Sequence, residues 1–481
     1  MITLARAVDD HARATPSKVA LIAADTGART TYAELAAKSA RLAGTLATAH
    51  GVGEGDRVAV LAWGHVHTFE LLVACCRLGA VLVPLNLRLS DHELGPVLAR
   101  CEAKVLLVDT SFAERAPEAT APRATFPVDA SAEPVTTTGD LALPLVMLFT
   151  SGTTGLPKGA LQPGKAIAAN ASSTADAWKL GAGDVALVDA PLFHTGGLNV
   201  LATPLLYAGG TVVVAPRFEA EASGDLIVEH RATIAFGVPT MLERFIATGV
   251  VDRSSVRLWV TGGAPCPHSL LDAFAEKGRM LVQGFGMTEC GPNCFRPFDG
   301  MAKGAIGLPT RALEMRLVDD DGADVPEGES GELLLRGPQL FLGYFRDPEA
   351  TRGAFRDGWL KTGDVLRATP EGWFVAGRKK EMFISGGENV YPAEVEAALM
   401  AHAAVAEAAV VSVPDPKWGE AGVAYVLTRA TATPEELRVF LRERIAAYKV
   451  PRTIHVEGEL PRTASNKIDK QALAKRAAQK S

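Results

Sequence analysis

The chain has 481 residues, of which 48% are hydrophobic and 22% are charged. A single hydrophobic core rarely serves so long a chain, so a large domain with a smaller one is expected. The 49 Lys and Arg residues against 55 Asp and Glu give a net charge of −6. This balance argues against a nucleic-acid-binding protein held by general electrostatics, because such proteins carry basic surfaces.

The amino terminus and the apolar runs bear on location, and the cysteines bear on metal binding. Residues 1–10 lack a basic segment followed by an apolar core, so no export signal is expected. No apolar run approaches ~18 residues, so we predict a cytoplasmic protein with no stable membrane insertion. Cys75 and Cys76 are adjacent, whereas Cys290 and Cys294 are separated by three residues, and neither pair has a histidine cluster at zinc spacing. Buried free thiols are therefore predicted rather than a metal site.

The first third of the chain alternates between helices and strands. Thr31 and Glu34 form a capping box at the start of a helix that Gly51 ends. Strands are expected at 56–61, 80–83 and 104–108, a helix through 69–79 and another from 91. Alternation at this spacing predicts a layered, mostly parallel α/β sheet. Residues 117–139 have no periodicity and are interpreted as a surface connection.

The most informative stretch runs from Leu143 to Gly159. Its apolar first half predicts a buried strand. Residues 150–159 then supply four hydroxyls, three glycines and Lys158, a composition that suits a loop closing over a polyphosphate. Lys158 follows a proline rather than the glycine of the P-loop motif, so that motif is absent. The alternative is a surface loop of turn-forming residues.

The middle of the chain continues the alternation and brings two glycine-containing turns after strands. We expect helices to residue 178, after 197, at 219–230 and after the Pro-Thr cap at 239–240, and strands at 185–188, 211–214, 258–260 and 280–282. The last two strands run into residues 262–265 and 284–289. Ligands gather at the carboxyl ends of strands in such sheets, so both turns are candidate ligand loops.

From about residue 305 the pattern changes to short strands and turns. Strands at 313–318, 331–336, 360–366 and 373–376 predict a small antiparallel barrel or sheet. After the charged break at 377–381, we expect a helix at 393–402, strands at 405–413 and 423–428, a helix at 434–447 and a basic tail. This section is interpreted as an independent α+β unit on a hinge.

Four isolated residues can carry chemistry, and each has an ordinary alternative. Glu289 can hold Mg²⁺, or it is a solvated residue or helix cap. Asp364 can accept both hydroxyls of a ribose, or it forms a simple turn. Lys467 is a cation on a turn-forming loop, otherwise a surface lysine, and His194 is a ligand or gate, otherwise a satisfied core histidine.

Taken in order, these segments resemble the motifs of the adenylate-forming superfamily over essentially the whole chain. The resemblance implies a phosphate loop at 150–159, an acyl-pocket histidine at His194, and a wall beside adenine and the acyl group at 262–265. The nucleotide residues implied are Thr150, Ser151, Gly152, Thr153, Thr154, Lys158, Gly263, Ala264, Pro265, Gly284, Phe285, Gly286, Met287, Asp364 and Arg378. It further implies catalytic roles for Thr288 at the α-phosphate, Glu289 on Mg²⁺, His194 and Lys467, with the hinge at Lys380.

Residues 384–396 look like the loop and helix of the acyl-CoA and aryl-CoA synthetase branch. The resemblance implies that the small domain rotates after adenylation and brings Ser385, Gly386 and Gly387 to the acyl-adenylate. Trp418 and Tyr448 are candidates for contacts with coenzyme A, with core packing as the alternative.

Three positions depart from the family pattern. Phe285 replaces the usual tyrosine, Asn466 stands where glycine normally precedes the catalytic lysine, and Glu381 follows Lys380 in the hinge. None of these changes removes a charge that the chemistry needs.

The resemblance implies an ATP-dependent carboxylic acid–CoA ligase that uses ATP, Mg²⁺ and coenzyme A. We expect an α/β N-terminal adenylation domain at 1–378, with layered sheets and a small β-barrel-like section, and a smaller mobile α+β C-terminal domain at 379–481. The expected pocket at 194–198, 236–239, 262–265 and 284–293 has no obvious cation for a second carboxylate, so a fatty or aromatic acid is predicted.

Three other functions stay open at this stage. A stand-alone adenylation protein would load a carrier-protein thiol, a phosphotransferase would release ADP, and a nucleotide sensor would lack one of Glu289, Asp364 or Lys467. All three residues are present. The sequence leaves a monomer and a homodimer equally open.

Overall fold

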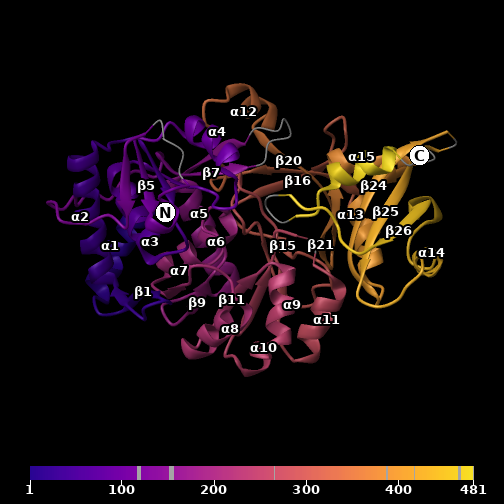
Figure 1. The fold of residues 1–481 in the computed structure, drawn as a ribbon, viewed down its shortest axis with the longest axis horizontal. Coiled ribbons are helices and arrows are strands. Elements are labelled where there is room, and N and C mark those ends of the chain that lie inside the picture. The colour runs from indigo at the N-terminus through magenta and orange to yellow at the C-terminus, as the bar shows by residue number, and fades with distance from the viewer. Residues whose placement is uncertain are drawn as a thin grey trace.

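The computed structural model describes residues 1–115, 121–150, 157–264, 266–385, 388–416, 418–463 and 467–479. Figure 1 shows a large domain built from two sheets with their helices, and a smaller C-terminal unit, coloured orange to yellow, packed beside it.

One seven-stranded sheet has the order β13-β12-β11-β9-β10-β1-β2 and is parallel except for the β1–β2 pair. Its strands are β1 (Val19–Ala23), β2 (Arg29–Thr31), β9 (Val185–Val188), β10 (Thr211–Val214), β11 (Ile234–Gly237), β12 (Leu258–Thr261) and β13 (Leu281–Gln283). Strands β10 and β12 are buried along their whole length, which is typical of a parallel sheet covered on both faces. The carboxyl ends of β9 to β13 therefore share one edge.

The second seven-stranded sheet has the order β18-β8-β7-β4-β3-β5-β6. Its strands are β3 (Arg57–Leu61), β4 (Val81–Pro84), β5 (Val105–Asp109), β6 (Arg123–Phe126), β7 (Pro144–Thr150), β8 (Lys158–Pro163) and β18 (Gly343–Tyr344). Strands β3 to β7 pair in parallel, and β7, β8 and β18 are antiparallel. The mostly parallel, layered α/β prediction is confirmed.

Helix α2 of the large domain begins and ends at the predicted signals. Thr31 and Glu34 form the capping box of α2, and Gly51 ends it in a left-handed conformation. The helices are α1 (Leu4–Ala14), α2 (Tyr32–His50), α3 (Val66–Leu78), α4 (Asp91–Cys101), α5 (Gly164–Trp178), α6 (Thr195–Asn199), α7 (Ala202–Ala208), α8 (Ala220–Glu229), α9 (Pro239–Ala247), α10 (Val250–Arg253) and α11 (His268–Glu276), with a 3-10 turn η1 at Thr110–Phe112.

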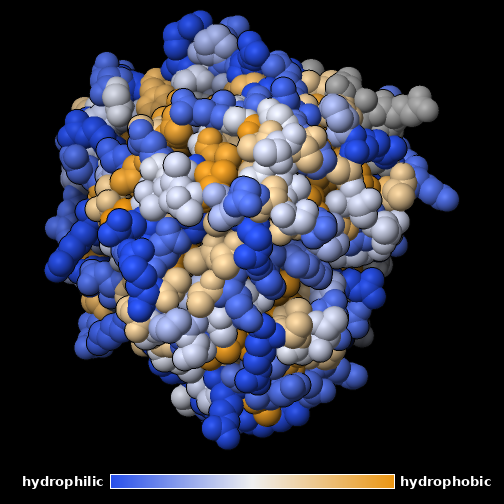
Figure 2. Space-filling view, turned by 90° about the vertical axis from the view of Figure 1, so that its left-hand side faces the viewer, coloured by the Kyte–Doolittle hydropathy of each residue, from blue (hydrophilic) through white to orange (hydrophobic). Residues whose placement is uncertain are grey.

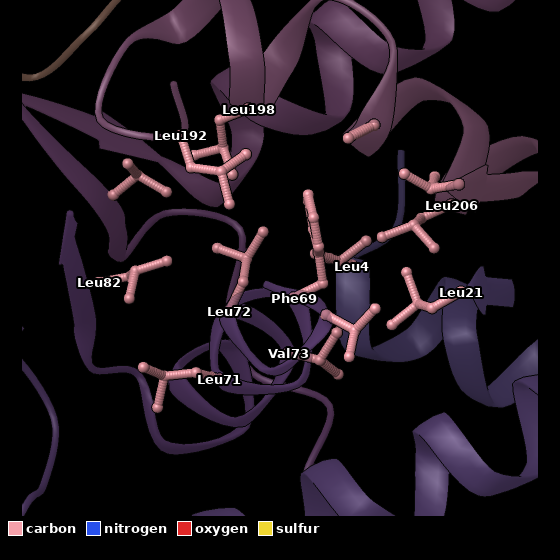
Figure 3. Packing of buried hydrophobic residues seen from close by; sticks show 14 of the residues in the cluster. Leu4, Leu21, Phe69, Leu71, Leu72, Val73, Leu82, Leu192, Leu198 and Leu206 are labelled. Carbon is pink, nitrogen blue, oxygen red and sulfur yellow. The ribbon is translucent and has the colours of Figure 1, made fainter. Parts of the chain in front are cut away.

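The largest apolar cluster lies around α3. Phe69 and Leu72 of that helix point toward Leu4 of α1 and toward the segment after β9 (Figure 3). Leu192 and Leu198, which flank His194, reach into the same cluster (Figure 3). Burying large side chains of this kind stabilises a fold by about 1.5–3 kcal/mol each. The turn that carries His194 is therefore anchored on both sides.

An antiparallel section follows the large sheets, as predicted. It consists of β16 (Glu314–Val318), β17 (Ser330–Arg336), α12 (Pro348–Ala354), β19 (Phe355–Arg356), β20 (Trp359–Thr369) and β21 (Gly372–Arg378), with a separate pair β14 (Phe295–Arg296) and β15 (Leu308–Pro309). Strand β20 is central, because β17, β19 and β21 all pair with it.

The C-terminal unit has one sheet and its own apolar clusters. It contains η2 (Lys379–Glu381), β22 (Phe383–Ser385), β23 (Glu388–Val390), α13 (Pro392–Met400), β24 (Val405–Asp415), β25 (Gly419–Thr428), α14 (Pro434–Arg442), η3 (Ala447–Lys449), β26 (Thr453–Glu457) and α15 (Lys470–Ala478). The preceding sheet ends at Arg378 and the new one begins at Phe383. A domain boundary at 378 and a hinge at Lys380 remain predictions.

Three sequence interpretations were wrong at the level of single elements. Strand β6 lies inside the predicted surface connection, β8 begins at Lys158 within the predicted loop, and the predicted basic tail contains β26 and α15. Strands β6 and β26 are short and carry few buried residues. Their periodicity is therefore too weak to read, and pairing with β5 and β25 decides their conformation.

The cysteines are free thiols, as predicted, and the surface shown is mainly hydrophilic. All six cysteines are free, and all but Cys266 are buried. On the face shown in Figure 2, hydrophilic residues predominate and apolar ones are scattered in small groups. Within the described ranges, no helix is long and apolar enough to cross a membrane.

Candidate active site

The candidate site lies where several strands end at one edge of the first sheet. His194 follows β9, Gly263 and Ala264 follow β12, and the segment 284–289 follows β13. Since these strands are parallel neighbours, their carboxyl ends are adjacent. Strands β20 and β21 add Asp364 and Arg378, which lie directly opposite each other in the register of that pair.

Asp364 is held as a buried carboxylate with one unused oxygen. Arg378 Nε lies 2.7 Å from its Oδ1. Its Oδ2 is buried and has no hydrogen-bond partner among the described residues. Burial raises the pKa of Asp364 to about 6, and the nearby charge of Arg378 opposes that rise. Asp364 lies within β20 and is only 4% exposed, so the simple-turn alternative is wrong, and its free oxygen suits a hydroxyl donor.

Glu289 is oriented by a tyrosine that the sequence did not single out. It is 6% exposed, so the solvated-residue alternative is wrong. The Tyr344 hydroxyl donates to Glu289 Oε1 at 2.7 Å. Tyr344 lies opposite Ala160 in the β18–β8 pair, and Lys158 Nζ lies 5.3 Å from the centre of its ring. Lys158 and the Glu289 carboxylate thus both lie against Tyr344, a contact between distant segments that has no sequence signature.

The backbone under Thr288 is fixed by buried amides. Gln162 Nε2 donates to the Thr288 carbonyl oxygen at 2.6 Å. Gln162 Oε1 in turn accepts from Asn199 Nδ2 at 3.1 Å, and Asn199 is bound by the Thr203 hydroxyl. Each of these amides is buried and would be costly to leave unpaired, so the network holds one arrangement.

Phe285 and its glycine neighbours form a tight wall. The Phe285 ring meets Phe295 edge-on, with ring centres 5.7 Å apart. A Cβ at Gly286 would lie 2.4 Å from the Gly291 carbonyl oxygen, so only glycine fits there. Gly284 donates its amide to the Thr261 carbonyl oxygen at 2.6 Å, and Met287 forms an isolated bridge with Gly291.

Lys467 comes from the end of the chain to the same edge. Burial, together with the charges of Lys467 and Arg88, lowers the pKa of His194 to about 4. Burial also lowers the pKa of Lys467, and the neighbouring Arg378 adds to this effect. Lys467 is exposed as a whole residue, but the protein atoms gathered around its ammonium group still disfavour the charge. The catalytic role of Lys467 stays a prediction, since a surface lysine is exposed as well. Figure 1 shows the yellow segment of the C-terminal unit that reaches toward the large domain.

The remaining predicted residues divide into two groups. Ser151, Gly152, Thr153, Thr154, Pro265, Gly386 and Gly387 lie outside the described residues. Of the described ones, Thr150 ends β7 opposite Lys158. Gly263 and Ala264 are both exposed, and Lys380 lies in η2.

Ser385 and Trp418 are brought together on the sheet of the C-terminal unit. Ser385 ends β22 opposite Gly419, the residue after Trp418. Trp418 is 37% exposed and carries the Arg452 guanidinium 5.7 Å above its ring centre. Tyr448 is also exposed, so core packing is wrong for both aromatic residues. Ser385 lies in the sheet of the C-terminal unit, whereas Asp364 lies in a different sheet, in β20.

Comparison with known proteins decides the family. Residues 8–345 match the AMP-binding enzyme family, and residues 394–467 match the AMP-binding enzyme C-terminal domain. The chain belongs to the AMP-binding enzyme family. Within the adenylate-forming superfamily it falls in the AMP-forming CoA-ligase branch, so it is an acid–thiol ligase.

Its relatives cover almost the whole chain. A feruloyl-CoA synthase from Amycolatopsis sp is 39% identical over 464 residues, 94% of each chain. An indoleacetate–CoA ligase from Aromatoleum aromaticum is 38% identical over 501 residues, 98% of each chain. The o-succinylbenzoate CoA synthetase of Bacillus subtilis, solved with its acyl-adenylate intermediate, shares 33% identity, 98% coverage of each chain and a TM-score of 0.88.

Proposed function

We propose that this ligase activates an aromatic acid with ATP and passes the acyl group to coenzyme A. A fatty acid is the second candidate substrate. The observation that carries the proposal is the proximity of Lys467 to His194 and Arg378, whose charges act on one another at the strand ends. It brings a cation from the C-terminal unit to the place where Asp364 offers a free carboxylate oxygen. A phosphate, a ribose and a carboxylic acid need just such groups.

The nucleotide is bound by residues of the large domain. Asp364 accepts the ribose hydroxyls through Oδ2, and Arg378 holds the carboxylate from its other oxygen. Phe285 lies against the adenine, keeping the stacking face of the usual tyrosine without its hydroxyl. Lys158 and the hydroxyl loop from Thr150 hold the β- and γ-phosphates.

Glu289 fits a magnesium site. It is a buried carboxylate oriented by Tyr344, and magnesium is usually bound by one or two carboxylates together with substrate phosphates. When bound there, Mg²⁺ neutralises phosphate charge. The Bacillus subtilis relative has also been solved with ATP and a magnesium ion.

The first half-reaction joins the acid to AMP. One carboxylate oxygen attacks the α-phosphorus, and the bond from that phosphorus to the leaving pyrophosphate breaks. Lys467 stabilises the negative charge that builds up on the carboxylate and the α-phosphate. Thr288 donates a hydrogen bond to the α-phosphate. His194 is neutral at pH 7, because its pKa is about 4, so it borders the carboxylate without adding a charge.

The second half-reaction transfers the acyl group to sulfur. The thiol of coenzyme A attacks the acyl carbon, the bond to AMP breaks, and the thiol proton leaves. We place the hinge for this step at Lys380, between the 1–378 and 379–481 domains. Rotation would bring the loop after Ser385 to the acyl-adenylate, with Trp418 as an exposed aromatic surface for coenzyme A.

The pocket walls favour an aromatic acid. Phe236 lies beside Gly196 and Gly262, so an aromatic ring borders the segment that follows His194. No Lys or Arg occurs among residues 194–198, 236–239 and 262–264, and the cations whose charges act on His194 are Lys467 and the exposed Arg88. Two of the relatives are named for feruloyl and indoleacetate substrates.

The free cysteines fit a reducing compartment and support a cytoplasmic location.

A panel of acids tests the proposal. The assay measures AMP release and acyl-CoA thioester with and without coenzyme A, and we expect an aromatic acid to give both products only with it. Pyrophosphate release that coenzyme A does not stimulate would instead favour the carrier-protein alternative. A clear preference for malonate or succinate would contradict the proposed acid class.

A further inference from the structure

A buried carboxylate that the mechanism does not use lies next to the proposed acid pocket. Asp189 comes directly after β9 and is 4% exposed. Its Oδ2 is buried without a hydrogen-bond partner among the described residues. Ser223 of α8 hydrogen-bonds the carboxyl group, so only one of its oxygens is engaged by a side chain.

This carboxylate borders a small cavity of about 10 Å³. That volume is about what one water molecule or one hydroxyl group needs. The cavity is lined by Leu187, Val188, Asp189, Ala190, Gly196, Gly197, Leu201 and Phe236. Apart from Asp189, every lining side chain is apolar or absent.

The cavity shares Gly196, Gly197 and Phe236 with the expected walls of the acid pocket. A Cβ at Gly196 would lie 3.4 Å from the Phe236 ring, and a Cβ at Gly262 would lie 3.9 Å from another atom of the same ring. Gly196 is two residues after His194. An acid whose carboxylate lies beside His194 and whose chain runs past Gly196 would have its distal end near this cavity.

Leaving this carboxylate unpaired is costly. Burial raises the pKa of Asp189 to about 6, and Ser223 opposes the rise. The group is still mostly ionised at neutral pH, and a buried charged acceptor without a donor is destabilising. A leucine of similar size would fill the same space without that cost. A hydrogen-bond donor on a bound ligand would offset the cost of burying this carboxylate.

We propose that Asp189 determines acid specificity by accepting, through Oδ2, a hydrogen bond from a hydroxyl group on the distal end of the acid. This inference rests on the proposed function and narrows its substrate class to hydroxylated aromatic acids. An acid without the hydroxyl leaves Oδ2 unpaired in an apolar cavity. Sites built to bind a substrate hydroxyl reject the analogue that lacks it for this reason.

The test compares acids that differ by one hydroxyl. The probes are 3-phenylpropanoate and its 4-hydroxyphenyl and 3-hydroxyphenyl analogues, and kcat/KM is measured for CoA-dependent AMP release by the full chain. We expect the native protein to prefer one hydroxylated acid by about 5- to 150-fold, the equivalent of about 1 to 3 kcal/mol. Comparing the 3-hydroxyphenyl with the 4-hydroxyphenyl acid shows from which ring position a hydroxyl reaches Asp189.

Two variants of Asp189 and one control decide the role of the side chain. In Asp189→Leu the preference should fall to within about 2-fold or invert, while turnover of 3-phenylpropanoate is kept. Asp189→Asn keeps a weaker, neutral acceptor and should give an intermediate ratio. The control is Asp225→Leu, an exposed carboxylate on α8, which should keep the native ratio.

Each other outcome overturns the inference in a recognisable way. An unchanged ratio in an active Asp189→Leu protein would mean that Asp189 holds only a structural water. If the leucine variant fails to fold, a native ratio in the asparagine variant leads to the same conclusion. A native protein that forms thioester without preferring either hydroxylated acid refutes this inference alone. A native protein that forms no thioester with any acid refutes the proposed function as well.

Discussion

Replacing Asp364 with asparagine should make the protein more stable without ligand and weaken its binding of nucleotide. The carboxyl group has one ion pair with the half-exposed Arg378 and one buried, unpaired oxygen. Its pKa rises from 3.8 to about 6 on folding, mainly because burial disfavours the charge. At 1.36 kcal/mol per tenfold change in protonation equilibrium, this corresponds to about 3 kcal/mol of destabilisation at neutral pH.

The sign of the pH dependence follows from this raised pKa. Between pH 3.8 and about 6 the folded protein keeps a proton that the unfolded chain has released. This carboxyl group therefore lowers the stability progressively as the pH rises through that window. Asp364→Asn does not titrate, so its advantage over the native protein should be greatest above pH 6 and shrink toward pH 4.

Thermal unfolding from pH 4.5 to 8 and calorimetric titration with AMP measure both effects. The asparagine variant should unfold at a higher temperature at pH 8 yet bind AMP about 10- to 150-fold more weakly, because it loses a charged acceptor. Glu371→Gln, an exposed residue in the turn between β20 and β21, is the matched control and should change neither quantity. An asparagine variant that is less stable at pH 8, or that binds AMP normally, would refute the reasoning.

Three further variants separate the steps of the reaction. Lys467→Ala should slow adenylation about 100- to 1,000-fold while supplied acyl-adenylate still reacts with coenzyme A; equal loss in both half-reactions would contradict its role. Tyr344→Phe frees the Glu289 carboxylate and should raise the Mg²⁺ concentration needed for half-maximal activity several-fold, measured by magnesium titration, whereas an unchanged titration curve would remove Tyr344 from the site. Lys380→Pro restricts the backbone at the proposed hinge and should leave pyrophosphate release nearly intact while thioester formation falls at least 10-fold; parallel loss of both would place the hinge elsewhere.

Local rules were enough for most of the large domain. The capping box at Thr31 and Glu34 and the stop at Gly51 depend only on neighbours in sequence, and the structure confirms them. The buried strands at 185–188 and 211–214 have apolar runs bounded by turn residues, and their bounds are confirmed to the residue. The prediction of a basic tail was wrong for β26, because the short β26 segment does not by itself show that it pairs with β25.

The sequence by itself determined the residue types of the site and their order along the chain. Glu289, Asp364 and Lys467 could be named because turns and charges between apolar runs are visible without coordinates. Only the tertiary structure decided their state. Whether a carboxylate is solvated or buried, as Asp364 and Asp189 are, depends on which distant atoms surround it. Tyr344 and Gln162 contact site residues that lie 55 and 126 positions away in the chain, so packing alone could reveal them.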